Sequence, residues 1–428
     1  MKTTMLLLLT MLVFAYALPA RAGDVDLLIE KLVSKGILTQ SDAEEITAEI
    51  ASEAQAVEST LVVQDMQAMP APRAAATAGS GWWERIKLKG DLRVRYQDES
   101  LDNAPTVGDL DIDDQDRWRI RWRAGALANV NEHWEVGFGL TSGGADGRST
   151  NQTLRRGFST GDARLDYAYT KFAATEHVDV LAGKFKNPLW TPKDLLWDSD
   201  LRPEGVAVPM EFTLADTIEA FVTPAYLVLS ESVSGSRDDI SMLVLQAGAT
   251  FDLSDTVSLK LAPAYYNFSG LEGSAGPVGL DVPSNSRDID GNLVNDYDAI
   301  TLAGQLSITG TELVPKVSIF GEFVNAFDPS DDETGWLAGF SFGDAKVSGA
   351  GDWQFKYNYR RLEADAWPEF LADSDLFFGA TNTKGSELEF VWGLARGVNV
   401  SLDYYSGAEF LGTDIEQDLL QLDLNLKW

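Results

Sequence analysis

The sequence feature that most constrains the fold is an alternation of polar and apolar residues along many segments after Trp82. Residues 85–95 and 117–123 alternate almost without error, and so do residues 354–360 and the last segment, 420–428. In a β-strand, such alternation places apolar side chains on one face and polar side chains on the other. The pattern therefore predicts an all-β fold built from amphipathic strands.

Two architectures can use amphipathic strands. A soluble sandwich buries the apolar face between two sheets, whereas a membrane barrel turns that face toward lipid and keeps the polar face in a wet lumen. The alternating segments are about 9–14 residues long, which suits tilted membrane crossings better than the strands of soluble sheets. Aromatic residues also cluster near segment ends, at Trp82, Trp83, Trp134 and Trp428. These features favour a transmembrane antiparallel β-barrel in contact with outer-membrane lipid.

The pattern predicts about 16 strands. They lie near residues 85–97, 117–130, 134–142, 162–173, 178–187, 205–213, 217–229, 239–252, 256–268, 297–309, 314–327, 334–343, 351–363, 386–395, 398–408 and 415–428. Short connections alternate with long polar ones through most of this region. An even strand count with that alternation is typical of a closed barrel whose two ends lie on the periplasmic side.

The first 22 residues are predicted to be a secretory signal peptide. Lys2 precedes a mostly apolar run over residues 5–18, and Ala20-Arg21-Ala22 forms a cleavage site of small residues. The alternative is a membrane anchor, but a run of about 14 residues is short of the ~20 that a spanning helix needs.

Residues 23–60 are predicted to form a short α-helical segment in the periplasm, before a linker at 61–81 and the barrel at 82–428. Helical spacing of apolar residues predicts two short helices, and Ser41 with Glu44 fits a capping box at the start of the second. The linker is rich in proline, alanine and glycine. Self-association, contact with the cell wall and a simple spacer stay open as roles for the helices.

Composition excludes several classes of function. The chain has no cysteine, so disulfides, zinc–thiolate sites and iron–sulfur clusters are excluded. It has 66 acidic and 34 basic residues, and this net charge of −32 argues against nucleic acid as a partner.

The first two predicted strands carry a stripe of basic residues. If apolar side chains face lipid, the pore-lining candidates are Arg85, Lys87, Lys89, Arg93, Arg95, Arg117, Arg119, Arg121 and Arg123. One interpretation is a cationic stripe that gives the channel a preference for anions. The other is a generic wet wall in which these cations pair with Asp91, Glu387, Glu389, Asp403 and Asp423. The sequence leaves both open.

The acidic residues are concentrated in the long connections. One run offers a candidate calcium loop made of Asp288, Asp290, Asn292, Asp296 and Asp298. Carboxylate and amide oxygens suit calcium, and Gly291 allows a sharp turn, but the run lacks a complete EF-hand register. No other cofactor is expected.

No catalytic arrangement emerges from the sequence. The two histidines, His133 and His177, fall in predicted tight turns, and no G-x-S-x-G, phosphate-binding loop or H-E-x-x-H motif is present. The sequence therefore predicts that the protein is not an enzyme.

The chain resembles the bacterial outer-membrane "putative porin" family. The resemblance rests on the segment Leu27–Ile46, the alternating strands, and Leu420–Trp428, which is similar to the C-terminal signal of outer-membrane barrels. It implies a barrel of about sixteen strands, recognition by the barrel-assembly machinery, passive diffusion of small hydrophilic solutes or ions, and homotrimers. The layout is also similar to that of phosphate-selective porins, although no phosphate-site residue can be assigned.

Two other functions stay open at this point. One is a non-conducting barrel that serves as a scaffold or sleeve for a partner protein. The other is a soluble secreted β-sheet protein that binds ligands or adheres to surfaces.

Overall fold

The computed structural model describes residues 82–102, 115–154, 157–158, 160–231, 239–277, 283–311, 314–412 and 415–428. The predicted signal peptide, helical segment and linker all lie outside the described residues. The short 3₁₀ helices η1 (Trp82–Arg85) and η2 (Phe377–Gly379) are the helices of this part of the chain. No helix there is long and apolar enough to cross a membrane.

Strands dominate the described residues and join in one sheet. They are β1 (Ile86–Asp102), β2 (Gln115–Asn129), β3 (Trp134–Thr141), β4 (Gln152–Thr153), β5 (Arg164–Ala173), β6 (Asp179–Lys184), β7 (Glu204–Ala207), β8 (Met210–Ala215), β9 (Ile218–Ser230), β10 (Ile240–Ser254), β11 (Val257–Ser269), β12 (Ala299–Thr309), β13 (Lys316–Ala326), β14 (Thr334–Gly343), β15 (Trp353–Leu362), β16 (Thr383–Ala395), β17 (Val398–Glu409) and β18 (Glu416–Lys427).

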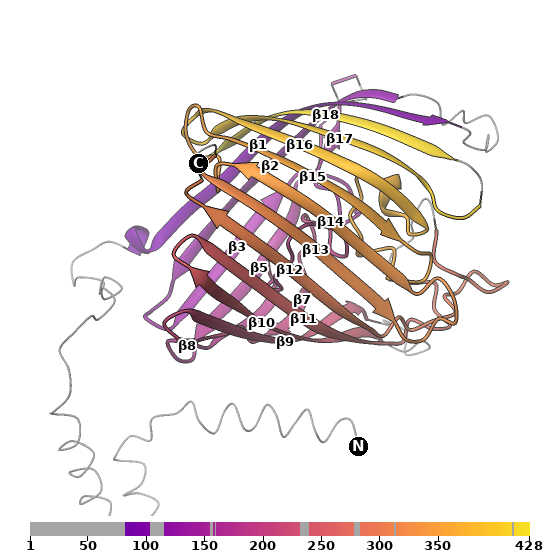
Figure 1. Cartoon of the computed structure of the whole chain (residues 1–428), viewed down its shortest axis with the longest axis horizontal. Coiled ribbons are helices and arrows are strands. Elements are labelled where there is room, and N and C mark those ends of the chain that lie inside the picture. The colour runs from indigo at the N-terminus through magenta and orange to yellow at the C-terminus, as the bar shows by residue number, and fades with distance from the viewer. Residues whose placement is uncertain are drawn as a thin grey trace, which may run out of the picture. The chain divides into compact units, whose positions relative to one another are not determined.

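The wall is a closed antiparallel barrel of sixteen strands, if β4 is left out and β7 and β8 are counted as one (Figure 1). The two-residue β4 adds to the long-loop end of β2, and β7 and β8 are two halves of one strand that both pair with β9. Val208-Pro209 separates the halves, and proline cannot donate a ladder hydrogen bond. The barrel closes where β1 pairs with β18, from Asp91↔Lys427 to Asp102↔Glu416. The predicted all-β barrel of sixteen antiparallel strands is thus confirmed.

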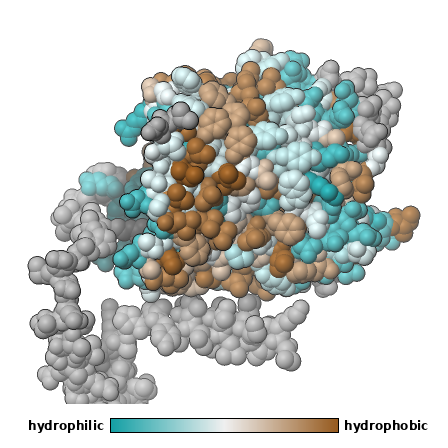
Figure 2. All heavy atoms as spheres, in the orientation of Figure 1, coloured by the Kyte–Doolittle hydropathy of each residue, from teal (hydrophilic) through white to brown (hydrophobic). Residues whose placement is uncertain are grey.

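The outer face of the barrel is apolar. Along β10, Met242, Val244 and Gln246 are buried, while Leu243 and Leu245 are each 49% exposed on the opposite face. Further exposed apolar side chains include Ile300 and Leu302 of β12 and Ile319 and Phe323 of β13. Figure 2 shows apolar residues gathered across the middle of the visible wall. Strand alternation thus presents lipid-compatible side chains outward, as a membrane barrel requires.

Two long connections fold into the barrel. The connection 185–203 touches the inward faces of both β10 and β16, through Trp190–Gln246 and Lys193–Glu387 contacts. These strands are six positions apart in the wall, so the connection must cross the interior. The connection 363–382 also crosses, because Trp367 packs on Tyr266 of β11 with ring centroids 4.8 Å apart.

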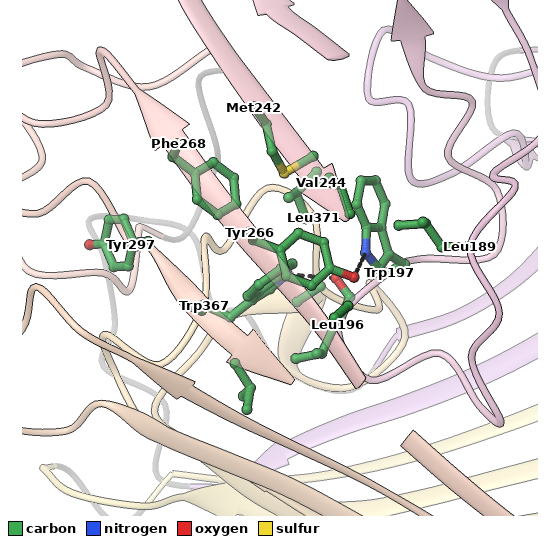
Figure 3. Packing of buried hydrophobic residues seen from close by; sticks show 14 of the residues in the cluster. Leu189, Leu196, Trp197, Met242, Val244, Tyr266, Phe268, Tyr297, Trp367 and Leu371 are labelled. Atoms are coloured by element: carbon green, nitrogen blue, oxygen red, sulfur yellow. Dashed lines mark hydrogen bonds between the residues drawn. The ribbon is translucent and has the colours of Figure 1, made fainter. Parts of the chain in front are cut away.

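The inward connections build an apolar core on one side of the lumen (Figure 3). Trp367 and Leu196 are fully buried there, and the Trp367 indole N–H donates to the Leu196 carbonyl at 2.7 Å. The inward side chains of β10 and β11, among them Met242, Val244 and Phe268, complete this core. The expectation of a polar inner face is therefore wrong for the long-loop halves of these two strands, because folded loops cover them. Gln246, Thr250 and Lys260 keep the other halves polar.

Candidate channel constriction

The other side of the lumen holds a charged cavity of about 420 Å³. Side chains of β1, β2, β16, β17 and β18 line it together with the two inward connections. Basic side chains come from β1 and β2, at Arg93, Arg95 and Arg121, and from other elements, at Arg148, Lys193, Lys346 and Lys427. Acidic side chains face the cavity from 194–200, 373–375 and the strands β16 and β17. Opposite charges thus meet within one narrow space.

The β1 arginines are held by one carboxylate across the closing seam. Arg95 donates to both carboxylate oxygens of Asp423, at 2.7 and 2.9 Å. The Arg93 Nε lies 3.1 Å from the same carboxylate. The register Arg95↔Asp423 between β1 and β18 makes this contact, because directly opposed residues share a face. Two guanidinium groups therefore share one negative charge.

The β2 arginines are mostly paired as well. Ion pairs join Arg121 to Asp91 at 2.9 Å, Arg123 to Asp200 at 2.8 Å, and Arg117 to Glu99 at 2.7 Å. Arg119 instead donates to the Gln97 amide oxygen at 3.0 Å and to the Ser149 hydroxyl at 3.3 Å.

The remaining stripe residues lie near the short-turn end of the barrel. Arg85, Lys87 and Lys89 are exposed, and Arg85 donates to the Val130 carbonyl. The structure thus brings three of the nine stripe residues to the charged cavity. Their effect on selectivity stays a prediction.

The acidic partners were only partly visible in the sequence. Asp91 and Asp423 do pair with the stripe, whereas Glu387 and Glu389 pair with Lys193 and not with the arginines of β1 and β2. The alternation pattern missed Asp200, which reaches Arg123 from the inward connection 185–203. Strand periodicity carries no information about where a loop residue will end, so no sequence signal could have placed Asp200.

Hydrogen bonds fasten the two inward connections to each other beside the cavity. The Asp198 carboxylate accepts from the backbone N–H and hydroxyl of Ser374, at 2.9 and 2.8 Å. The Asp198 backbone N–H donates to the Leu371 carbonyl at 2.8 Å. The acidic side of the cavity is therefore a rigid edge of the loop core.

Burial and neighbouring charged groups shift the pKa values of the aspartates along this edge. Burial, followed by Asp373 and Asp200, raises the pKa of Asp198 well above its ordinary value. Burial and Asp194 raise the pKa of Asp373 to about 8, although Arg360 opposes the shift. The pKa of Asp200 is lowered, because Arg123 and Arg121 outweigh its burial. Asp198 and Asp373 therefore carry protons under conditions in which Asp200 is ionised.

This arrangement predicts a pH-dependent ion preference. Raising the pH from about 6 to about 9 should deprotonate Asp373, because its pKa is raised to about 8. The added negative charge should move the reversal potential in a salt gradient toward cation preference. The packed loops hold protons that unfolded loops would release, so the same rise should also weaken loop packing. The shift should vanish in Asp198→Asn/Asp373→Asn, and its persistence there would contradict this origin.

The candidate calcium residues do not converge in the structure. Asp288 accepts from the backbone N–H groups of Asp290 and Asn292 within its own turn. Asp296 accepts from two backbone N–H groups at 271–272, and Asp298 accepts from Phe268. These carboxylates thus brace the loop, and a calcium site there stays an untested prediction.

Neither histidine lines the charged cavity among the described residues. His133 and His177 lie in the short turns after β2 and β5, as the sequence predicted. His177 is 3.3 Å from the adjacent Glu176 and half exposed.

A closed sixteen-strand barrel with an apolar outer wall and a charged interior is the architecture of the porin class of bacterial outer-membrane proteins. The "Putative porin" family profile matches residues 109–297 and 292–428. The chain therefore belongs to this family, as the sequence resemblance indicated.

Solved structures of outer-membrane channels are similar to the chain at low sequence identity, and the likeness to OprB supports the barrel fold. Pseudomonas putida OprB, in a high-pH structure, is 12% identical with a TM-score of 0.52, over 81% of this chain and 94% of OprB. The outer-membrane channel DcaP of Acinetobacter baumannii is 12% identical with a TM-score of 0.44, over 80% of this chain and 97% of DcaP. A triple mutant of Rhodopseudomonas blastica porin is 9% identical with a TM-score of 0.43, over 80% of this chain and all of that one. No curated protein matches the chain.

Proposed function

We propose that this protein is a channel for passive diffusion of small hydrophilic solutes or ions across the outer membrane, with no covalent step. The observation that carries the proposal is the charged cavity beside the loop core. Packed loops fill one side of the lumen, and ionised or hydrogen-bonding side chains line the space that is left. Such a lining replaces part of the hydration of a polar solute, whereas it gives an apolar solute no favourable contact.

The direct test is electrical. The mature protein is refolded in detergent and added to a planar lipid bilayer, and current is recorded under a salt gradient. Discrete, ohmic current steps are expected. Insertion without current would contradict the channel and favour the second candidate, a non-conducting scaffold, which the apolar loop core inside the barrel supports. The soluble-sheet alternative is disfavoured, because the apolar strand faces point outward.

We further propose a weak anion preference. Arg93 and Arg95 have Asp423 as their common close partner, with Asp375 farther away at 3.7 Å from Arg95, and Arg119 donates to neutral partners. The β1–β2 wall therefore has more arginines than carboxylates in direct contact with them. The preference should be weak, because acidic side chains face that wall across the cavity.

Neutralising this wall should move permeation toward cations. In Arg93→Gln/Arg119→Gln/Arg121→Gln, the reversal potential under a potassium chloride gradient should shift in the cation direction. The shift should be larger at about 10 mM than at about 1 M salt, because salt screens charges. An unchanged reversal potential would refute the role of the stripe.

Membership of the porin family supports three further proposals about topology and assembly. We propose that the short turns and the helical segment lie in the periplasm, and that the barrel-assembly machinery recognises Leu420–Trp428. We also propose that three barrels associate as a homotrimer. Light scattering on the detergent-purified protein, corrected for bound detergent, would show a trimeric or a monomeric mass.

A further inference from the structure

We propose that Lys193 sets the ion preference of the channel by acting as a built-in cation. Its ammonium group occupies a cage of carboxylates on the barrel wall, which would otherwise attract mobile cations into the constriction. This inference rests on the proposed channel function and adds a specificity-determining residue opposite the β1–β2 wall.

The cage lies on the inward faces of β16 and β17. Carboxylate oxygens of Glu387, Glu389 and Asp403 lie within 4.8 Å of one another, and all three residues line the charged cavity. The Lys193 Nζ lies 2.8 Å from Glu387 and 3.4 Å from Glu389. It also lies 3.3 Å from Asp194, the next residue in its own connection. Lys193 therefore sits where a mobile cation would find the most negative charge.

Two other cations hold the cage from the wall. Arg360 pairs with Glu387, and Lys356 lies 2.9 Å from Glu389, both from β15. Neither Arg360 nor Lys356 lines the charged cavity, whereas Lys193 does. Lys356 instead lines an adjoining inward cavity of about 230 Å³. Lys193 is thus the cation that lies between these carboxylates and the charged cavity itself.

The connection that carries Lys193 is anchored independently of it. Trp190 and Gln246 exchange two hydrogen bonds, of 2.7 and 2.9 Å. On the other side of Lys193, Leu196 accepts from Trp367, and Asp200 pairs with Arg123. Because anchors flank Lys193 on both sides, its ammonium group can be removed without releasing the connection from the wall.

Removing this charge should reverse the local field. In Lys193→Met, the side chain keeps a similar length while the cage loses its cavity-facing cation. Coulomb's law in water gives roughly a threefold change in the cation-to-anion permeability ratio for one charge at the wall of a narrow pore. The exposed cage should also retain calcium, because hard divalent cations prefer clustered carboxylate oxygens.

The test compares four variants in planar bilayers. Reversal potentials are measured in potassium chloride gradients for the wild type, Lys193→Met, Lys193→Arg and Lys346→Met, and single-channel currents are then recorded with millimolar calcium. Lys346 is the matched control, because it lines the same cavity but is exposed and outside the cage. The fourth variant, Lys193→Met/Glu389→Gln/Asp403→Asn, neutralises two of the three cage carboxylates as well as the lysine and leaves Glu387 paired with Arg360.

In Lys193→Met, the reversal potential should shift toward cation preference by more than in Lys346→Met, and the current should fall when calcium is added. Lys193→Arg should behave as the wild type. The variant that also lacks the carboxylates of Glu389 and Asp403 should show neither effect. Equal shifts of the reversal potential in Lys193→Met and Lys346→Met would overturn the proposal, because the loss of any positive charge in the lumen would then have the same effect. A shift that persists without the cage would also overturn it and would indicate a displaced loop. A wild type that passes no current would instead refute the channel function itself.

Discussion

Replacing Trp367 with alanine is expected to enlarge the single-channel conductance and to make the open current noisier. Trp367 is fully buried between Tyr266, Phe268 and the Leu196 carbonyl, so it joins both inward connections to β11. Truncating a buried tryptophan costs about 3–5 kcal/mol of packing free energy, which is large for two loops that cover one side of a lumen. The loops should therefore leave the wall for part of the time and open more of the barrel to ions.

The control for this change is Trp392→Ala. Trp392 lies on β16 but is 44% exposed on the outer face, so its loss should leave the conductance unchanged. Hydrogen exchange provides a second measurement: amides at 193–201 and 366–376 should exchange faster in Trp367→Ala, while strand amides keep their protection. Wild-type conductance together with wild-type exchange in the loops would show that Trp367 does not hold the core.

Replacing Asp423 with asparagine is expected to produce a strong preference for anions. This carboxylate is the shared partner of Arg93 and Arg95, and its side chain is 1% exposed. Without it, two guanidinium groups beside the cavity lose their main counter-charge, and the permeability ratio should move roughly threefold or more toward chloride. Breaking a buried ion pair costs about 3–5 kcal/mol, an effect that Asp375, 3.7 Å from Arg95, should reduce.

The matched control is Asp418→Asn, in the same strand with the same change. Asp418 is exposed and accepts from the Tyr404 hydroxyl at 2.7 Å on the outer face, so its charge lies outside the lumen. The prediction fails if both variants shift the reversal potential equally, or if Asp423→Asn leaves it where the wild type has it. Thermal unfolding of Asp423→Asn monitors the accompanying loss of stability.

The wall of the barrel could be predicted from the sequence because the alternation of polar and apolar residues in each strand indicates which side chains face inward and which face lipid. The segments 334–343 and 398–408 match β14 and β17 to within one residue at each end. The prediction fails at 205–213, where the strand is broken into β7 and β8 around Pro209. The predicted strand 85–97 also ends too early. The observed strand β1 continues to Asp102, because β18 pairs with it that far.

The interior could not be predicted in the same way. Apolar residues of the connections, such as Leu196 and Trp367, have no strand partner whose register would place them. Their positions follow from packing against inward side chains of distant strands, and a linear pattern does not contain that information. The stripe on β1 and β2 was visible for the opposite reason, since basic residues recur at every second position except Asp91 over 85–95 and at every second position over 117–123. Its neutralisation by Asp200 depends on the loops and was not visible.

The span of the contacts inside the barrel has a consequence for the order of folding. Arg95 and Asp423 are 328 residues apart in the chain, and Arg148 and the Glu369 carbonyl that it contacts are 221 apart. Contacts between such distant residues form late, because the loop entropy between them must be overcome first. Lys193 and Asp375 find their wall partners on β16 and β18, which are synthesised near the end. The charged cavity can therefore become ordered only after the last strands have been added, and closure of the wall should precede its final packing during biogenesis.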